Sequence, residues 1–179
     1  MTALFLGCSL FAFAQEETEE STTPIAERKH EFRVDALEGL VAPAIDVSYE
    51  YVISKYSGAG VSVLIGLTNE NSGDYPKFAF TPYYRQYFFN KQDYGARGFF
   101  AEGLLNYSSG TVDFFTGNDF SPTEEDWSAF GIGFAIGQKW ISQNGFIVEI
   151  SAGVGRNFGD DDFAPEAFFR GGVSVGYRL

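Results

Sequence analysis

Apolar and polar residues alternate along most of this chain, and this period of two constrains the fold more than any other feature. After residue 29, turn-forming residues divide the sequence into about eight segments. Their bounds are 30–40, 43–53, 59–68, 76–89, 96–108, 128–141, 145–157 and 167–179. Each segment is long enough for a tilted strand to cross a bilayer. The even number of segments and the lack of helical periodicity predict an all-β, eight-stranded antiparallel up-and-down transmembrane β-barrel.

The two faces of these segments differ in size as well as in polarity. In 43–53 the large face consists of Ile45, Val47, Tyr49, Tyr51 and Ile53, and the small face of Ala44, Asp46, Ser48 and Glu50. In 128–141 the large face carries Phe130, Ile132, Phe134, Ile136 and Trp140, opposite a face made mainly of glycine and alanine. One face of the predicted sheet therefore carries large apolar side chains, and the other carries small or charged ones.

Two kinds of closed barrel fit this alternation. A soluble, lipocalin-like barrel holds its large apolar face inside around a ligand, whereas a membrane barrel turns that face to lipid. The interior of eight strands is only wide enough for side chains to fill it, so the small face fits inside and the aromatic face does not. The pattern favours the membrane barrel, and a soluble or lipid-anchored ligand-binding barrel is the alternative.

Outward aromatic residues are expected at both ends of a membrane barrel, where strands meet the bilayer interface. If the amino-terminal tail lies in the periplasm, one set falls near the periplasmic end: Tyr51, Phe88, Phe99, Trp140, Phe146 and Tyr177. A second set falls near the outer end: Phe78, Tyr107, Phe130 and Phe169. We therefore expect two aromatic girdles.

Charged residues of both signs share the inward face of the predicted strands. They are Arg33, Asp35, Asp46, Glu50, Lys77, Arg85, Glu102, Lys139, Glu149, Arg170 and Arg178. Because unpaired charges are costly in a narrow interior, we expect these residues to form a plug of hydrogen-bonded ion pairs. A small ion path lined by the same residues is the alternative.

The net charge of −12 resides in the tail and in the predicted outer loops. Three of these loops, at about 69–75, 109–127 and 158–166, are longer than the periplasmic turns and are acidic. An acidic rim opposes nucleic acid, because nothing in it neutralises phosphate. The runs 124–126 and 160–162 could hold a hard cation such as Ca²⁺, but no loop matches an EF-hand, so we expect solvated loops without a metal.

The segment before residue 30 differs from the rest of the chain. An apolar stretch ends at Ala14 in a small-x-small pattern, which predicts a signal peptide over 1–14, with lipidation at Cys8 as the alternative. Residues 15–29 are acidic and rich in Ser and Thr, and are expected to form a disordered tether. The barrel is then expected to occupy 30–179.

Candidate catalytic groups are scarce. His30 is the single histidine and stands at the first residue of the predicted barrel, where no Ser-His-Asp arrangement can be built around it. Cys/His metal patterns are absent. The alternating glycines of 128–141 and 145–157 supply small inward side chains and do not form a phosphate loop. The sequence therefore predicts no enzyme activity and no cofactor.

Three stretches together resemble a known group: 47–51 (VSYEY), 80–85 (FTPYYR) and 171–179 (GGVSVGYRL). They are similar to small, mostly uncharacterised outer-membrane barrels of Bacteroidota, described as porin-like or OmpX-like. The resemblance covers 30–179 and implies a barrel in the outer membrane of a Gram-negative cell. The last strand also resembles the signal that barrel-insertion machinery recognises, although Leu179 replaces the usual final aromatic residue.

These observations lead to three functional expectations. The first is a structural or surface-interaction protein that contacts a surface ligand through acidic loops containing Phe114, Phe115, Phe120, Trp127 and Phe163, although these aromatic residues could instead extend strands above the membrane. The second is a narrow porin or small-solute transporter. The third is the soluble or lipid-anchored ligand-binding barrel.

Overall fold

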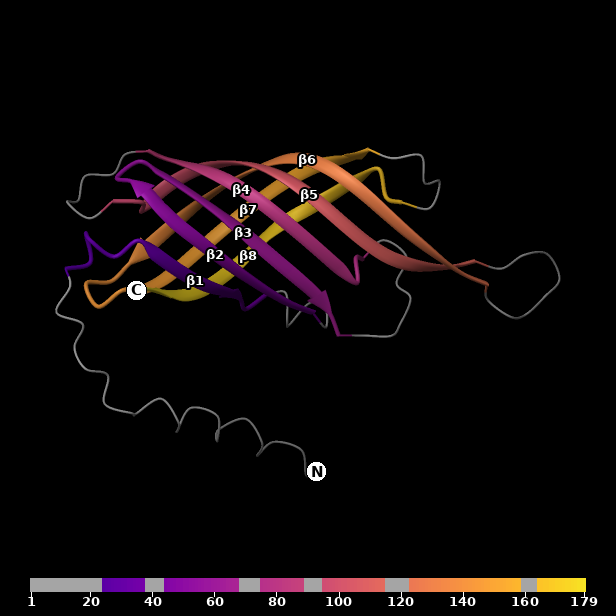
Figure 1. Cartoon of the computed structure of the whole chain (residues 1–179), viewed down its shortest axis with the longest axis horizontal. Coiled ribbons are helices and arrows are strands. Elements are labelled where there is room, and N and C mark those ends of the chain that lie inside the picture. Colours follow the sequence, from indigo (N-terminus) through magenta and orange to yellow (C-terminus); the bar gives the residue numbers. More distant parts are fainter. Residues whose placement is uncertain (1–23, 38–43, 68–74, 89–94, 115–122, 159–163) are drawn as a thin grey trace, which may run out of the picture.

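Eight strands form a closed barrel. The computed structural model describes residues 24–37, 44–67, 75–88, 95–114, 123–158 and 164–179. Each strand pairs antiparallel with its neighbours in the chain, and β1 closes the barrel against β8 (Figure 1). The strands are β1 (His30–Asp35), β2 (Ala44–Ser54), β3 (Ser57–Gly66), β4 (Phe78–Phe88), β5 (Gly98–Phe114), β6 (Thr123–Ile141), β7 (Phe146–Phe158) and β8 (Ala167–Arg178). The predicted eight-stranded antiparallel barrel is confirmed.

The two ends of the barrel differ. At one end, which we call the turn end, β2 meets β3, β4 meets β5 and β6 meets β7, and the chain enters β1 and leaves β8 (Figure 1). The turn at 142–145 connects β6 to β7 as predicted, with Ser142 N–H donating to the carbonyl of Phe146. From the opposite end, the loop end, the long β5–β6 hairpin projects (Figure 1).

Strands β5 and β6 correct the predicted connection at 109–127. They continue past the predicted strand ends and pair with each other from Gly110↔Trp127 to Phe114↔Thr123. The neighbouring strands β4 and β7 do not follow them this far, because the β4–β5 ladder ends at Ser109 and the β6–β7 ladder begins at Phe130. Most of the predicted loop is therefore a two-stranded ribbon beyond the barrel wall.

The first strand is shorter than predicted. β1 ends at Asp35, and residues 36–37 form a turn rather than continuing the strand. Asp35 stabilises this turn, since its Oδ1 accepts a hydrogen bond of 2.8 Å from the Leu37 N–H. An aspartate that bonds to the backbone two residues later is a common turn former, and it competes with strand extension.

Residues 24–29, which the sequence placed in a tether, lie against the turn end. They form a turn over 25–27, and the Lys29 carbonyl accepts a hydrogen bond from Val52 N–H. Arg28 reaches the turn between β6 and β7, where its Nη1 donates to the Asn144 carbonyl at 3.1 Å. The predicted signal peptide over 1–14, Cys8, residues 15–23, the acidic run 160–162 and Phe115, Phe120 and Phe163 lie outside the described residues.

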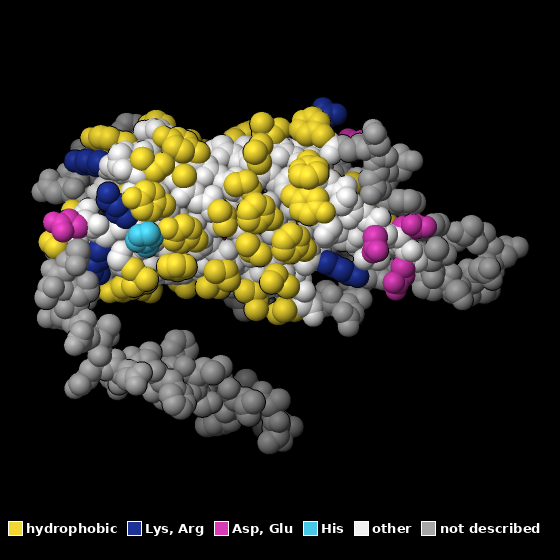
Figure 2. Space-filling view, in the orientation of Figure 1, with side chains coloured by type: hydrophobic (Ala, Val, Ile, Leu, Met, Phe, Trp, Pro, Cys, Tyr) yellow, Lys and Arg dark blue, Asp and Glu magenta, His cyan; other side chains and the backbone are white. Residues whose placement is uncertain are grey.

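The strands turn their large apolar side chains outward. Phe169, Phe130 and Phe134 are 86%, 67% and 62% exposed, and exposed Ile, Leu, Val and Tyr side chains extend this surface around the barrel. Figure 2 shows the apolar side chains over the middle of one face, with charged ones toward its two ends. None of the described residues forms a helix long and apolar enough to span a membrane.

Candidate functional site

Ion pairs connect charged side chains through the lumen, most of them in the part nearest the turn end. Among the described residues, five acidic and five basic side chains take part: Glu31, Asp46, Glu50, Glu102, Glu149, Arg33, Arg85, Lys139, Arg170 and Arg178. We call this set the lumen cluster. The cluster includes residues from seven strands, β1, β2, β4, β5, β6, β7 and β8. Alternation along each strand directs these residues to the same side of the sheet, and barrel closure then brings them together.

Glu50 and Glu149 hold the centre of the lumen cluster. Glu50 Oε2 lies 2.8 Å from Arg33 Nη1 and 3.1 Å from Arg85 Nη1, and its Oε1 lies 3.1 Å from Lys139 Nζ. Glu149 Oε2 lies 2.7 Å from the same Arg85 nitrogen. Glu50 and Lys139 are both 0% exposed, so each charge depends on its neighbours rather than on water.

Aromatic side chains surround the cluster and add hydrogen bonds to it. The Tyr87 hydroxyl donates to Glu50 Oε1 at 2.5 Å, and Arg33 Nη2 donates to the Tyr83 hydroxyl at 2.6 Å. The Arg85 guanidinium lies 4.2 Å from the centre of the Phe100 ring, and Lys139 Nζ lies 4.5 Å from that of Tyr87. These rings exclude water from the charges and attract the cations through their faces.

Arg178 closes the cluster at the turn end. Its Nε donates to Glu31 Oε1 at 2.7 Å, and its Nη1 and Nη2 donate to the carbonyls of Gly95 and Ala96 at 2.9 and 3.0 Å. The side chain of the last described strand therefore fixes both the first strand, through Glu31, and the segment that leads into β5. Tyr87, Phe100 and the fully buried Ala96 form an apolar group at the same end.

Two of the predicted lumen charges are not members of this cluster. Asp35 lies nearer the loop end, where its Oδ2 accepts from the Ser174 hydroxyl at 3.4 Å. Lys77 precedes β4 and borders a separate hollow beside the β5–β6 hairpin, with Thr111 and Asp126. The other nine predicted residues are all in the cluster, which the sequence pattern placed on one face without giving their partners.

Glu31 is the cluster residue that sequence reasoning missed. It is fully buried and contacts Arg33, Lys139 and Arg178. Its position two residues before Arg33 gives it the same inward parity, so the alternation contained the signal. Glu31 is the second residue of the predicted strand, and side chains at a strand end are usually exposed to solvent, so its burial was not predicted.

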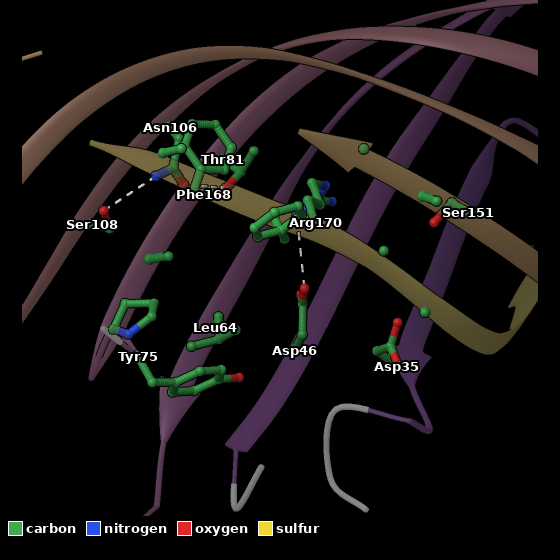
Figure 3. Close-up of a pocket in the computed structure, with 18 of the residues that line it drawn as sticks. Asp35, Asp46, Leu64, Tyr75, Thr81, Asn106, Ser108, Ser151, Phe168 and Arg170 are labelled. Carbon is green, nitrogen blue, oxygen red and sulfur yellow. Dashed lines mark hydrogen bonds and ion pairs between the residues drawn. The ribbon is translucent and has the colours of Figure 1, made fainter. Parts of the chain in front are cut away.

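A cavity of about 960 Å³ occupies the rest of the lumen, on the loop-end side of the cluster. Arg85 and Glu149 contribute to its lining and belong to the cluster as well. Asp46, Arg170 and Phe168 also line it, and Figure 3 shows Arg170 of β8 opposite Asp46 of β2. Asp46 Oδ2 lies 3.7 Å from Arg170 Nη1. The lumen therefore consists of a packed charged part and an open part, rather than of a plug along its whole length.

Polar side chains continue along the cavity wall. The Thr81 hydroxyl donates to Asn106 Oδ1 at 3.0 Å, and Asn106 Nδ2 donates to the Ser108 hydroxyl at 3.2 Å. Asp46 accepts a hydrogen bond from the Ser62 hydroxyl. Figure 3 shows Asn106, Thr81 and Ser108 grouped on one side of the cavity, with Asp35 and Ser151 on the other.

Trp127 corrects an expectation about the loops. The sequence placed it in a loop as an exposed aromatic residue, with strand extension as the alternative. It lies in β6, is 2% exposed and lines the cavity. Gly110 on β5 leaves room for the indole ring, because a Cβ at residue 110 would lie only 2.6 Å from Trp127 Cζ2.

The predicted girdle residues lie on the outward face. Nine of them are exposed: Tyr51, Phe88, Phe99, Trp140, Phe146, Tyr177, Phe78, Phe130 and Phe169. Tyr107 is half-buried against Phe130, with ring centres 4.8 Å apart. The strand ends place the first six near the turn end and the others toward the loop end.

Within the described ranges, no group of three or more His, Cys, Asp or Glu side chains is arranged to hold a metal ion. The acidic run 124–126 lies at the start of β6, where Asp126 Oδ1 accepts a hydrogen bond of 2.9 Å from the Thr111 hydroxyl. This contact is an ordinary cross-strand hydrogen bond.

Comparison with known proteins supports the fold. No protein-family model matches the chain, and a search of curated proteins gave no match. Among solved structures, the N-terminal β-barrel domain of Pseudomonas aeruginosa OprF is similar, with a TM-score of 0.54 and 12% sequence identity over 88% of this chain and 100% of that chain. The relation to Bacteroidota barrels stays a prediction. The protein thus has an eight-stranded antiparallel β-barrel fold similar to that of the OprF domain.

Proposed function

We propose that this protein is an outer-membrane β-barrel whose lumen is closed by the lumen cluster and whose role is a structural or surface interaction at the loop end. The observation that carries this proposal is the inverted distribution of side chains. Charged residues such as Glu50 and Lys139 are fully buried, whereas Phe130, Phe134 and Phe169 are largely exposed. Water would favour the reverse arrangement on both counts, and a bilayer favours this one.

The soluble barrel fits the same observation poorly. A lipocalin-like protein needs an apolar interior for its ligand and a polar exterior for water. Here the interior has ion pairs and hydroxyl groups, and the exterior has rings that would associate in water.

The narrow porin is the second candidate, and the cavity is the observation that favours it. About 960 Å³ of lumen lies open on the loop-end side. An ion continuing toward the turn end would have to separate Arg85 from Glu149, at 2.7 Å, and then pass Tyr87 and Phe100, which are 1% and 0% exposed. Because both obstacles lie in series, we favour the closed barrel.

A depth-dependent substitution tests the membrane assignment. Phe134 lies in the middle of the barrel part of β6, and Phe158 lies at the loop-end limit of β7. In lipid, Phe134→Arg is expected to cost about 2–4 kcal/mol and Phe158→Arg about 0–1 kcal/mol, because the penalty for a charge on the lipid face falls toward the interface. Urea titration of the full chain in phospholipid vesicles, followed by the mobility difference between folded and unfolded protein on a gel, measures both.

The same pair of variants distinguishes the alternatives. In a soluble barrel, both arginines would face water and neither would destabilise the protein. Equal urea midpoints for the two variants and the wild type, together with folding in the absence of lipid or detergent, would contradict the membrane proposal.

A further inference from the structure

Two polar atoms on the cavity wall are buried and have no hydrogen-bond partner among the described residues. They are the indole Nε1 of Trp127 and the amide Oδ1 of Asn157. Trp127 and Asn157 are 2% and 9% exposed, and both line the cavity. The other amide atom of Asn157, Nδ2, donates to the Pro165 carbonyl at 2.8 Å, which fixes the orientation of the group.

Leaving such atoms unpaired is unfavourable. A buried donor or acceptor without a partner costs about 1–3 kcal/mol, so each one in a native protein requires a reason. Trp127 supplies a donor and Asn157 supplies an acceptor. A hydroxyl group can both accept from the indole N–H and donate to the amide oxygen, and a molecule with several hydroxyls can do both at once.

The wall also offers aromatic surface beside these atoms. Phe168 of β8 lines the cavity, and its ring lies over inward glycines of β6 and β7. A Cβ on Gly131 would lie 2.5 Å from Asn157 Oδ1 and 2.6 Å from Phe168 Cε1, and a Cβ on Gly155 would overlap the same ring. The inward glycines of β6 and β7 therefore make room for Asn157 and Phe168 on the wall.

The charges of the cavity argue against an anionic ligand. Its lining contains Asp35, Asp46, Glu149 and Glu166 against Arg85 and Arg170. Arg85 is bound by Glu50, Glu102 and Glu149, and Arg170 by Asp46 and Glu102. Both cations are therefore already paired with carboxylates, and a phosphate or carboxylate would meet an acidic wall.

We propose that this cavity binds a neutral mono- or disaccharide unit, entering from the loop end. A sugar ring has apolar C–H faces that can lie on Phe168 and hydroxyls at its edge that can reach Trp127, Asn157 and Asn106. The volume is within the range of about 300–1,000 Å³ for small-molecule sites, and the mixture of aromatic wall and few polar groups is typical of them. This inference rests on the proposed function, in which the loop end faces away from the cell, and it names the class of ligand that the surface role would involve.

The two tryptophans of the chain allow a direct test, because one lines the cavity and the other lies on the outward face. In the full chain with Trp140→Phe, Trp127 is the remaining tryptophan, and its fluorescence reports on the cavity. The matched control, Trp127→Phe, retains Trp140 and is expected to show no response. The protein is folded in a detergent without a sugar headgroup, and the probes are methyl glycosides of glucose, galactose, mannose and N-acetylglucosamine and their disaccharides.

We expect at least one neutral probe to change the Trp127 signal in a saturable way. By isothermal calorimetry, Trp127→Phe and Asn157→Leu should weaken that probe about 3- to 10-fold, the value of one hydrogen bond. Trp127→Phe removes part of a buried ring and is expected to lower the urea midpoint of the free protein modestly. Both variants are therefore shown to be folded before the loss of affinity is assigned to the lost hydrogen bond. Dextran is included to distinguish the end of a polysaccharide from a free sugar.

Three results would overturn the proposal: no neutral probe alters Trp127 at millimolar concentration, Trp127→Phe binds the best probe as tightly as wild type, or glucose 6-phosphate and glucuronate bind better than neutral sugars. Each is independent of the membrane and conductance measurements, because binding in micelles requires neither orientation nor a closed lumen. A barrel that conducts ions yet binds a sugar would contradict the closed-lumen proposal alone.

Discussion

Glu50 shows how a single side chain organises the interior. It is 0% exposed and contacts Arg33, Arg85, Lys139 and the Tyr87 hydroxyl. A buried ion pair is weak evidence of net stabilisation, because desolvation offsets much of the attraction, but removing one partner leaves an uncompensated charge. The cluster is therefore expected to be sensitive to loss of any central member.

We predict that Glu50→Gln lowers the free energy of unfolding by about 3–5 kcal/mol, since three cations then share one carboxylate fewer. Glu125→Gln makes the same chemical change at an exposed position on the β5–β6 ribbon and is the matched control, with an expected effect of less than about 1 kcal/mol. Urea titration in vesicles measures both. Equal effects would mean that the cluster does not depend on its internal charges.

Glu31 and Asp35 show what the alternation of residues predicts and what it does not. Parity alone places both inside, with Arg33 between them. Only barrel closure shows that Glu31 pairs with Arg178, opposite it in the β1–β8 register, whereas Asp35 instead caps a turn. These partners are distant in sequence, so no local pattern contains them.

At the scale of elements, β5 and β6 depart most from the other strands. Beyond Ser109 and before Phe130 they pair only with each other, which leaves both edges of the ribbon without a strand partner among the described residues. Turn-forming and acidic residues in this stretch predicted a loop. Strand preference depends strongly on the available partner, and the continuing β5–β6 ladder supplied one.

Removing the ribbon tests whether it serves the barrel or a partner. We predict that replacing residues 111–126 by an Asn-Gly turn keeps Gly110 and Trp127 paired and changes the free energy of unfolding, measured by urea titration, by less than about 1 kcal/mol, because the deleted residues pair with no strand outside the ribbon. Binding of the whole cells to surfaces or other cells should fall. Normal adhesion by a correctly folded deletion variant would reject a surface role for this element.

At the scale of the whole molecule, the lumen is divided. Its turn-end part is packed with charges and rings, and its loop-end part is the cavity of about 960 Å³. The arrangement suits a protein that receives a ligand from one side without passing it to the other. The boundary between the two parts is the Arg85–Glu149 pair.

We predict that the wild-type barrel shows no steady nanosiemens-sized openings in planar bilayers, because ion pairs and aromatic rings block the lumen in series. The double variant Arg85→Ala/Glu149→Ala removes opposite charges together and extends the cavity toward the turn end. It should show more frequent openings than wild type. Steady conductance of the wild-type protein would contradict the closed lumen and favour the porin.

Sequence alone determined the class of fold, the strand faces and most of the buried charges, because a period of two reports which side of a sheet each residue occupies. It could not determine which charges pair, how far β5 and β6 extend, or that the loop-end part of the lumen stays open. The charge pairs depend on contacts between strands far apart in the chain, such as Glu31 with Lys139 and with Arg178, and the length of β5 and β6 depends on how far these two strands stay paired beyond the wall. Barrel closure sets these contacts, and closure is a property of the tertiary structure.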